Sequence, residues 1–196
     1  MADHTGLPIH AFADQAAWEA WLAGQGTGSP GLWLKFAKAD SGVASVSKPE
    51  AIETALAHGW IDGQLDKFDD RFWLVRFTPR GPKSKWSEIN RTTAERLIAE
   101  KRMTPMGQSE VDKAKADGRW DMAYAPQSKM EVPDDLQAAL DADPAAKAFF
   151  ATLRGANRYA VLYRIHDAKT DKTRAGRIEK FVGMLSRGET LHPAKG

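Results

Sequence analysis

The spacing of apolar residues divides the chain into a first part of mixed helices and strands and a last part that is purely helical. Apolar side chains three and four residues apart predict helices, and strict alternation predicts strands. By these rules the first part contains a helix over 14–24, a strand over 32–36, a helix over 47–58, strands over 60–68 and 71–78, and helices over 87–102 and 104–118. From residue 133 the pattern predicts only helices, the last two over 156–167 and 171–187.

Several predicted helices begin at a residue whose side chain can accept a hydrogen bond from a free backbone amide. Ser47 and Glu50 have the spacing of a capping box, with a proline in the first turn. Thr104 and Asp143 each stand directly before a proline, which suits the first position of a helix. Gly188 ends the last helix.

These elements predict an α+β fold. We expect a small antiparallel sheet with a central β-hairpin, about 60–78, flanked by helices and followed by an all-helical C-terminal part. The length of 196 residues fits a single domain, 1–196. The alternative is a subdivision into a mixed α/β part, 1–125, and a helical part, 130–196.

The loop length of the hairpin decides which side chains share a face. A two-residue loop would place Asp62 opposite Phe77 and mix polar with apolar residues on both faces. A three-residue loop would place Asp62 opposite Thr78 and Gln64 opposite Arg76, so that polar and apolar residues separate. The same register gives two further pairs, Leu65 with Val75 and Lys67 with Trp73. We therefore predict the three-residue loop.

The polar face of this hairpin is either solvated or the floor of a ligand pocket. The segment that follows favours a pocket, because cations, hydroxyls and an aromatic precede a helix N-terminus, where backbone amides attract anions. Guanidinium and indole groups suit an aromatic or anionic small molecule. The predicted ligand-binding residues are Trp60, Asp62, Gln64, Arg76, Thr78, Arg80, Lys83, Ser84, Trp86 and Asn90.

The same region carries a family resemblance. The motifs are residues 53–63, Glu-Thr-Ala-Leu-Ala-His-Gly-Trp-Ile-Asp-Gly, residues 76–80, Arg-Phe-Thr-Pro-Arg, and residues 84–90, Ser-Lys-Trp-Ser-Glu-Ile-Asn. With these motifs the chain resembles the YdeI/OmpD-associated, or bacteriocin-protection, family. Residues near the C-terminus, among them Tyr159 and Arg174, also match that family's helical end. The resemblance implies a protective role against bacteriocins and antimicrobial stress, without a defined reaction.

Composition excludes several kinds of chemistry. The chain has no cysteine, which excludes disulfides, thiolate zinc sites and a cysteine nucleophile. The five histidines show no metal-ligand spacing, and no phosphate-binding loop or nucleophile elbow is present, so we expect neither a metal nor another cofactor. His58 near a helix end fits a capping or packing role and stays a minor candidate base. Without a leader or a membrane span, we expect a cytoplasmic protein.

Three functional hypotheses remain. The first is a small-molecule-binding protein with a protective or stress role, its ligand held by the hairpin face and the 80–90 segment. The second is an enzyme of unknown reaction that uses Asp62 as acid or base with Arg76 as electrostatic partner. The third is a nucleic-acid-associated factor acting through the basic C-terminal helices, which is less favoured because a net charge of +2 is small. A homodimer is an alternative role for one cluster of the seven tryptophans.

Overall fold

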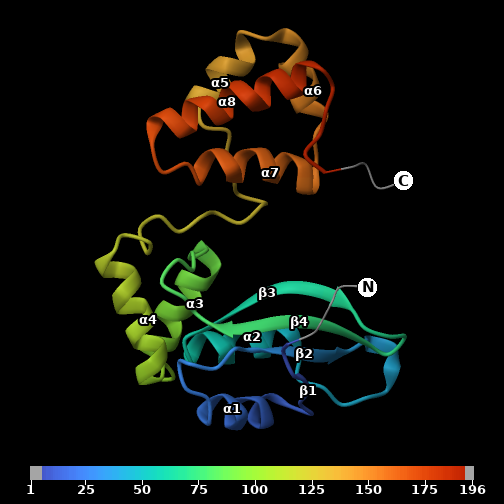
Figure 1. Ribbon diagram of the computed structural model, residues 1–196, viewed down its shortest axis with the longest axis vertical. Coiled ribbons are helices and arrows are strands. Elements are labelled where there is room, and N and C mark those ends of the chain that lie inside the picture. Colours follow the sequence, from blue (N-terminus) through green and yellow to red (C-terminus); the bar gives the residue numbers. More distant parts are fainter. Residues whose placement is uncertain (1–5, 193–196) are drawn as a thin grey trace. The chain divides into compact units, whose positions relative to one another are not determined.

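The computed structural model describes residues 6–192 of the chain, so His4 lies outside the described residues. The chain divides into two compact units at Ala123 and Tyr124 (Figure 1). The first unit combines a sheet with helices, and the described part of the second contains only helices. The prediction of an α+β fold with a helical C-terminal part is confirmed.

The first unit contains four strands and four α-helices in its described part. They are β1 (Ile9–Ala11), α1 (Gln15–Ala23), β2 (Leu32–Ala37), α2 (Lys48–Ala57), β3 (Trp60–Lys67), β4 (Phe72–Pro79), α3 (Glu88–Ala99) and α4 (Pro105–Ala116), with a short 3-10 turn at Ala39–Ser41. The capping box at the start of α2 is present, with the Ser47 amide donating to Glu50 Oε2 at 2.9 Å and the Glu50 amide donating to Ser47 Oγ at 3.4 Å.

The sheet has the strand order β1-β2-β4-β3. It is mixed instead of purely antiparallel, because β1 runs parallel to β2. The hairpin of β3 and β4 occupies one edge of the sheet, with β3 outermost. The sequence pattern misses β1 because this strand has only three residues, all exposed, so it shows no alternation of apolar and polar positions.

The hairpin combines the two registers that the sequence allows. Two predicted pairs are present, Leu65 with Val75 and Lys67 with Trp73. Nearer the base of the hairpin, Asp62 lies opposite Phe77 and not opposite Thr78, because the register shifts between Asp62 and Leu65. A β-bulge at this point adds one residue to β3, so the three-residue-loop register holds next to the turn and the other register holds beyond the bulge. The predicted pair of Asp62 with Thr78 is therefore wrong, whereas Gln64 lies within the bulge, where the register shifts.

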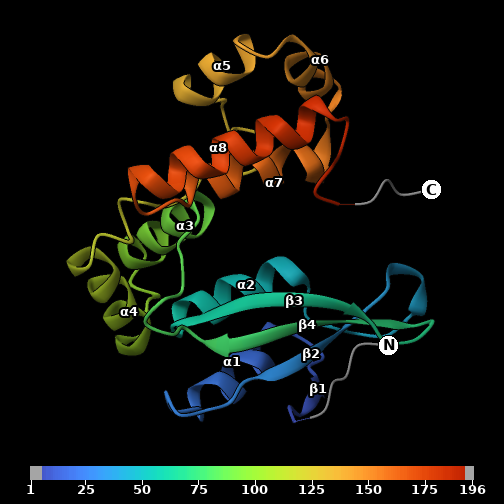
Figure 2. The same ribbon diagram turned by 45° about the horizontal axis from the view of Figure 1, so that its top comes forward.

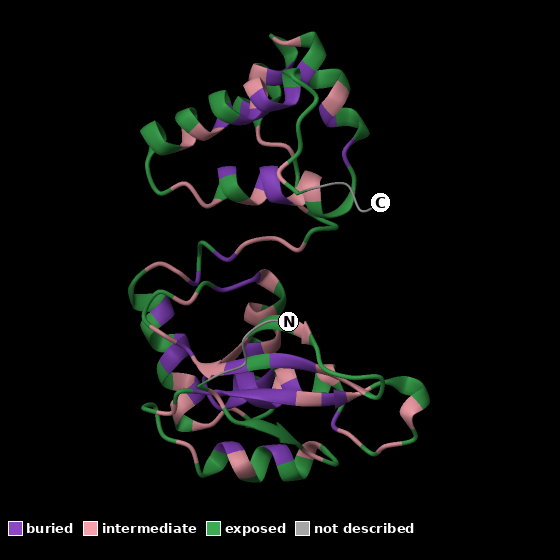
Figure 3. Cartoon of the chain, turned by 45° about the vertical axis from the view of Figure 1, so that its right-hand side comes forward, coloured by how far each residue is buried: buried purple, intermediate pink, exposed green. Residues whose placement is uncertain are grey.

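One face of the sheet carries the largest core of the first unit. The core side chains of the sheet are Leu32, Leu34, Phe36, Trp60, Val75 and Phe77, and they pack against α1 and α2. Figure 3 shows the long buried stretches within the sheet. The indole Nε1 of Trp18 in α1 donates to the Ala51 carbonyl in α2 at 3.1 Å, which ties the two helices together.

The tryptophans belong to the interior of the first unit. All seven lie between residues 18 and 120. Five are buried, namely Trp18, Trp33, Trp60, Trp86 and Trp120. The other two, Trp21 and Trp73, are partly buried and pack against the core of the first unit.

Helices α3 and α4 lie beyond one end of the strands (Figures 1 and 2). The start of α4 is bound to the end of α2, because the amide and the hydroxyl of Thr104 both donate to the Ala57 carbonyl, at 3.0 and 2.8 Å. Thr104 is also the predicted N-cap of α4, and its Oγ accepts from the Gly107 amide at 3.2 Å. The approach of the two helices is close enough that Gly107 has no space for a side chain.

The second unit contains four helices in its described part. They are α5 (Asp134–Asp141), α6 (Pro144–Thr152), α7 (Gly155–His166) and α8 (Asp171–Ser186). Helix α8 contacts the other three, and their apolar faces form a separate core. The predicted cap at Asp143 is confirmed, since its Oδ1 accepts from the Ala146 amide at 2.9 Å.

Two arginines of α8 close the C-terminal end of α7. The last carbonyls of a helix lack intrahelical partners and carry partial negative charge. Arg174 donates to the Ile165 carbonyl at 3.2 Å, and Arg177 donates to the Arg164 carbonyl. Arg174 also forms a two-bond ion pair with Asp135 in α5 at 2.5 and 2.8 Å. These cations therefore hold the helical unit together.

Candidate functional site

The bulge in β3 separates the residues that the sequence placed on one polar face. Directly opposed residues of two strands share a face, so Asp62 shares the face of Phe77, which belongs to the core beneath α1 and α2. Arg76 precedes Phe77 in β4 and points to the opposite face, where it is exposed. The acid and the arginine of the proposed enzyme hypothesis thus lie on opposite faces of the sheet, which contradicts their pairing.

The other predicted hairpin residues follow the same division. Trp60 lies on the face of Asp62 and is only 1% exposed, because it packs in the core. Thr78 lies opposite Ile61 on the face of Arg76 and is half-buried. Gln64 is in the bulge and is exposed. The structure therefore does not bring these side chains together into one polar floor.

The 80–90 segment uses its polar groups within the protein. The Arg80 guanidinium lies 3.8 Å from the ring centroid of Trp86, and it donates to the Lys85 carbonyl at 3.2 Å. Both side chains are buried, at 6% and 2% exposure. Ser84 accepts from the Gly81 amide through its hydroxyl, and Ser87 caps α3. The cation and the indole that the sequence assigned to a ligand bind each other instead.

The remaining residues of this predicted site lie at its surface. Lys83 is exposed and Asn90 is half-buried, and the Asn90 amide donates to Ser87 Oγ at 3.1 Å. The Ser84 carbonyl accepts from Arg119 at 2.8 Å. Hydrogen bonds within the loop, and one from Arg119, therefore stabilise this loop without a ligand.

A polar cleft of about 330 Å³ lies elsewhere in the first unit. Its lining comes from α1, α2 and the link between α3 and α4, and consists of Gln15, Glu19, Thr54, Ala57, Lys101, Arg102, Met103 and Thr104. Several of these groups are already paired. Gln15 Nε2 donates to Thr54 Oγ1 at 2.9 Å, and Arg102 pairs with Glu53 at 2.8 Å.

His58 lies beside this cleft, at the end of α2. Its side chain is 8% exposed, and its Nε2 is 3.9 Å from Glu19 Oε1 with no hydrogen-bond acceptor or donor within reach among residues 6–192. Burial lowers the pKa of the imidazole, and the nearby Glu19 carboxylate opposes that shift. The histidine is a packing residue next to a pocket wall, with one ring nitrogen directed toward Glu19.

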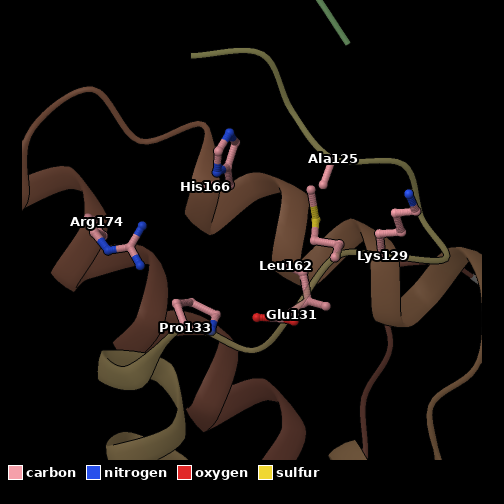
Figure 4. Close-up of a pocket in the computed structure, with 8 residues that line it drawn as sticks. Ala125, Lys129, Glu131, Pro133, Leu162, His166 and Arg174 are labelled. Atoms are coloured by element: carbon pink, nitrogen blue, oxygen red, sulfur yellow. The ribbon is translucent and has the colours of Figure 1, made fainter. Parts of the chain in front are cut away.

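A second pocket, of about 250 Å³, lies within the helical unit (Figure 4). Its lining residues are Ala125, Lys129, Met130, Glu131, Pro133, Leu162, His166 and Arg174. In Figure 4 His166 and Arg174 lie on one side, Lys129 and Ala125 on the other, and Leu162 lies toward the base. The pocket thus has nitrogen-bearing side chains around it, and the Glu131 carboxylate lies beside Leu162.

The three tyrosines of the chain form one cluster in the same unit. The Tyr163 ring contacts Tyr124 at 5.0 Å and Tyr159 at 5.5 Å between centroids. Burial, together with the other two tyrosines, raises the pKa of Tyr159 to about 12. Because Tyr124 and Tyr163 are next in sequence to the pocket residues Ala125 and Leu162, tyrosine signals can report on this pocket.

The ion pair of Arg174 with Asp135 predicts an acid-sensitive contribution to the stability of the helical unit. The guanidinium lowers the pKa of the Asp135 carboxyl below its ordinary value of 3.8. A carboxyl with a lowered folded pKa stabilises the fold fully above its unfolded pKa and loses this effect as the pH falls through the folded pKa. We expect Arg174→Met to lower the thermal midpoint at neutral pH and to differ less from wild type well below pH 3.8.

Far-UV circular dichroism measures the difference in thermal midpoint between Arg174→Met and wild type. Tryptophan fluorescence identifies any transition of the first unit. The difference should narrow without vanishing, because Arg174 also donates to the Ile165 carbonyl, which does not titrate. Lys180→Met is the matched control, since this exposed cation of α8 has no ion pair among the described residues. A difference in thermal midpoint between Arg174→Met and wild type that stays constant as the pH is lowered would contradict the assigned role of Asp135.

The basic C-terminal residues are less available for nucleic acid than their number indicates. Arg174 and Arg177 cap α7, Arg158 lies 4.6 Å from the Phe150 ring centroid, and Arg187 pairs with Glu189 at 2.9 Å. Half of the eight cations that alternate with apolar residues in the last two predicted helices thus have partners within the unit. The eight are Arg158, Arg164, Lys169, Lys172, Arg174, Arg177, Lys180 and Arg187.

Sequence patterns did not identify the residues of either pocket as a group. The cleft combines residues from 15 to 104 and the second pocket combines residues from 125 to 174, so only packing brings each set together. One local signal was available for the bulge, since Gly63 inside a strand pattern often marks such an irregularity. Over the described residues, no helix has the length and apolar character to cross a membrane, and no cluster of acidic or histidine side chains could hold a metal ion.

Comparison with known families gives two matches. Residues 10–110 match a family described as Domain of unknown function (DUF8412). Residues 129–188 match a family described as Bacteriocin-protection, YdeI or OmpD-Associated, which confirms the resemblance through the C-terminal segment. The three motifs over 53–90 fall within the first match. Searches among curated proteins and among solved structures gave no match.

Proposed function

From the premise that the chain belongs to the family described as Domain of unknown function (DUF8412), whose model matches just over half of it, we propose a protective role that depends on a small molecule bound by the helical unit. The name of the family that matches 129–188 suggests protection against bacteriocins. The pocket of Figure 4 lies almost entirely within those residues. That coincidence is the observation that carries the proposal.

The lining supports a ligand with an apolar body and an anionic group bound at the nitrogen-bearing side chains, because the Glu131 carboxylate of the same lining repels an anion placed beside it. Met130, Pro133 and Leu162 provide the apolar contact. Arg174 is already bound to Asp135 and to a carbonyl, so it contributes positive charge but few free hydrogen-bond donors. His166 and Lys129 are exposed and are the side chains left to bind the anion.

The proposed pocket is not at the hairpin face where the sequence predicted the ligand. The bulge divides the residues of that face between the two sides of the sheet. The chemical class of ligand remains the one expected from composition, a small molecule that is aromatic or anionic. A volume of about 250 Å³ limits the ligand to roughly the size of a two-ring aromatic acid, near the lower end of small-molecule sites.

Binding is tested with 1-naphthoate and its uncharged counterpart 1-naphthalenemethanol, followed by amide chemical shifts and by calorimetry. We expect 1-naphthoate to shift resonances of the pocket residues and to bind about tenfold more tightly than the alcohol, because only the acid has an anionic group. His166→Ala and Lys129→Ala should each weaken 1-naphthoate binding, whereas Lys180→Ala should not. Equal binding of acid and alcohol, or shifts confined to other residues, would overturn the proposed site.

The protective role is tested by expressing the chain in a bacteriocin-susceptible host. The wild-type chain should raise the bacteriocin concentration that inhibits growth, and a chain with both His166→Ala and Lys129→Ala should not. Circular dichroism must show that the double variant is folded. Equal protection by the two chains would separate the protective role from this pocket.

A further inference from the structure

The polar cleft of the first unit is lined by side chains of both charges. Glu19 comes from α1, and Lys101 comes from the link between α3 and α4. The cleft has a volume of about 330 Å³, which leaves room for a small solute of several heavy atoms. Such a solute can be bound only by polar lining groups that have no partner within the protein.

Most of the other polar groups of the cleft already have partners. Arg102 pairs with Glu53 at 2.8 Å and with Glu100 at 3.1 Å. The Thr54 hydroxyl donates to the Glu50 carbonyl, and the Thr104 hydroxyl donates to the Ala57 carbonyl. These contacts fix the walls of the cleft.

Lys101 is different. Within residues 6–192 its ammonium group makes no ion pair and no hydrogen bond. It is also the only residue other than glycine with positive φ in that part of the chain, at 58°. The Arg102 amide donates to the Leu97 carbonyl, so Lys101 occupies the left-handed position of a helix-ending motif that favours glycine. A lysine at this position costs stability, because its backbone conformation is strained. The fixed backbone also sets the direction in which the lysine side chain leaves it.

Glu19 faces the same cleft from α1. The buried His58 lies behind it, with Nε2 3.9 Å from Oε1 and beyond hydrogen-bond distance. The Glu19 side chain is 61% exposed, so its carboxylate is accessible to a cation. Gln15, one turn earlier on α1, uses its amide nitrogen on Thr54 and leaves its carbonyl oxygen as a further acceptor.

We propose that this cleft binds a small zwitterion of amino-acid or dipeptide size, with its ammonium group at Glu19 and Gln15 and its carboxylate at Lys101. The charges of the ligand match the accessible carboxylate of Glu19 and the unpaired ammonium of Lys101 in the described lining. The site is separate from the proposed pocket of the helical unit, because its residues all belong to the first unit.

The two units can be measured independently. All tryptophans lie in the first unit and all tyrosines in the second, so selective excitation of tryptophan reports on the first unit. Trp18 and Trp21 stand on either side of Glu19 in α1, and their rings stack at 5.4 Å. A ligand at Glu19 should therefore change tryptophan emission.

The probes are L-alanyl-L-alanine, its N-acetyl derivative, its C-terminal amide and free L-alanine, added to the full chain. We expect the dipeptide to bind and each blocked derivative to bind about tenfold more weakly or not at all, because each lacks one charge. Binding of free L-alanine would assign the site to single amino acids, and its absence would assign it to dipeptides. Equal binding of the dipeptide and both blocked forms, or no binding by any probe, would overturn the proposal.

Lys101→Gly separates binding from folding. Glycine removes the strain of the left-handed backbone, so we expect the thermal midpoint to rise by about 3–5 °C while dipeptide binding weakens about tenfold. Lys101→Arg should preserve binding, and Glu19→Gln should abolish it. Glu95→Gln, an exposed carboxylate of α3 outside the cleft, should change neither property. Full binding by Lys101→Gly would overturn the role of Lys101.

Discussion

Replacement of Trp86 by alanine is expected to lower the free energy of unfolding of the first unit by about 4 kcal/mol, the range found for removal of a large aromatic core residue. Trp86 is 2% exposed and packs between Arg80, at 3.8 Å, and Trp120, at 4.8 Å between ring centroids. Its indole Nε1 has no acceptor among the described residues, so the loss comes from packing and from the cation–π contact. Urea unfolding followed by tryptophan fluorescence measures the change.

Arg76→Ala is the matched control for Trp86→Ala, since both residues were assigned to one ligand site by the sequence pattern. Arg76 is exposed on the face of the sheet opposite the core, so we expect a change within about 0.5 kcal/mol. Should Trp86→Ala instead retain wild-type stability, the packing role described for Trp86 would be incorrect. The indole would then again be a candidate for contact with a ligand.

Replacement of Gly107 by alanine is expected to lower the free energy of unfolding by about 3 kcal/mol, although alanine normally favours a helix. A Cβ atom at this position would lie 2.2 Å from the Ala57 carbonyl oxygen and 2.5 Å from Met103 Sδ. The start of α4 would have to move away from α2. That movement would break the two hydrogen bonds from Thr104 to Ala57 O, each of which contributes about 1 kcal/mol.

The same substitution at Gly176 provides the control. Gly176 lies inside α8, and a Cβ atom there would meet nothing within 4 Å. Gly176→Ala should therefore stabilise the helical unit by about 0.5–1 kcal/mol. Thermal unfolding by circular dichroism, with tryptophan fluorescence for the first unit, compares the two variants. A stabilising Gly107→Ala would show that α2 and α4 do not approach as closely as the structure has them.

The movement of α4 also connects this prediction with the cleft. Ala57, Met103 and Thr104 line the cleft and are the residues that Gly107→Ala would displace. Weaker binding of a zwitterion would therefore accompany the loss of stability. Lys101→Gly differs in this respect, because it should weaken binding while raising stability.

Helix positions were predictable because their signals are local. The capping box of Ser47 and Glu50 and the caps at Thr104 and Asp143 are each formed within four residues. The last two helices, Gly155–His166 and Asp171–Ser186, begin and end within one residue of the prediction. Hydrogen bonding between near neighbours depends little on the rest of the fold.

The predicted ligand site depended on the register of a hairpin, which is a longer-range property. The rule that polar and apolar residues separate selected one register for the whole hairpin. The bulge between Asp62 and Leu65 satisfies that rule near the turn and violates it at the base, so Asp62 shares the core face with Phe77. Polar residues at an edge strand tolerate this arrangement, because Asp62 is only partly buried there.

The amino-acid sequence by itself determined the α+β class, the helices with their caps, the hairpin, and the residues that carry the family resemblance. These follow from periodicity and from contacts between residues a few positions apart. Only the tertiary structure decided that Arg80 binds Trp86, that Arg174 caps α7, and that Glu19 and Lys101 line one cleft. The reason is physical: each of these contacts depends on packing between separate elements, and chain spacing does not encode which charged side chain finds a partner and which remains free.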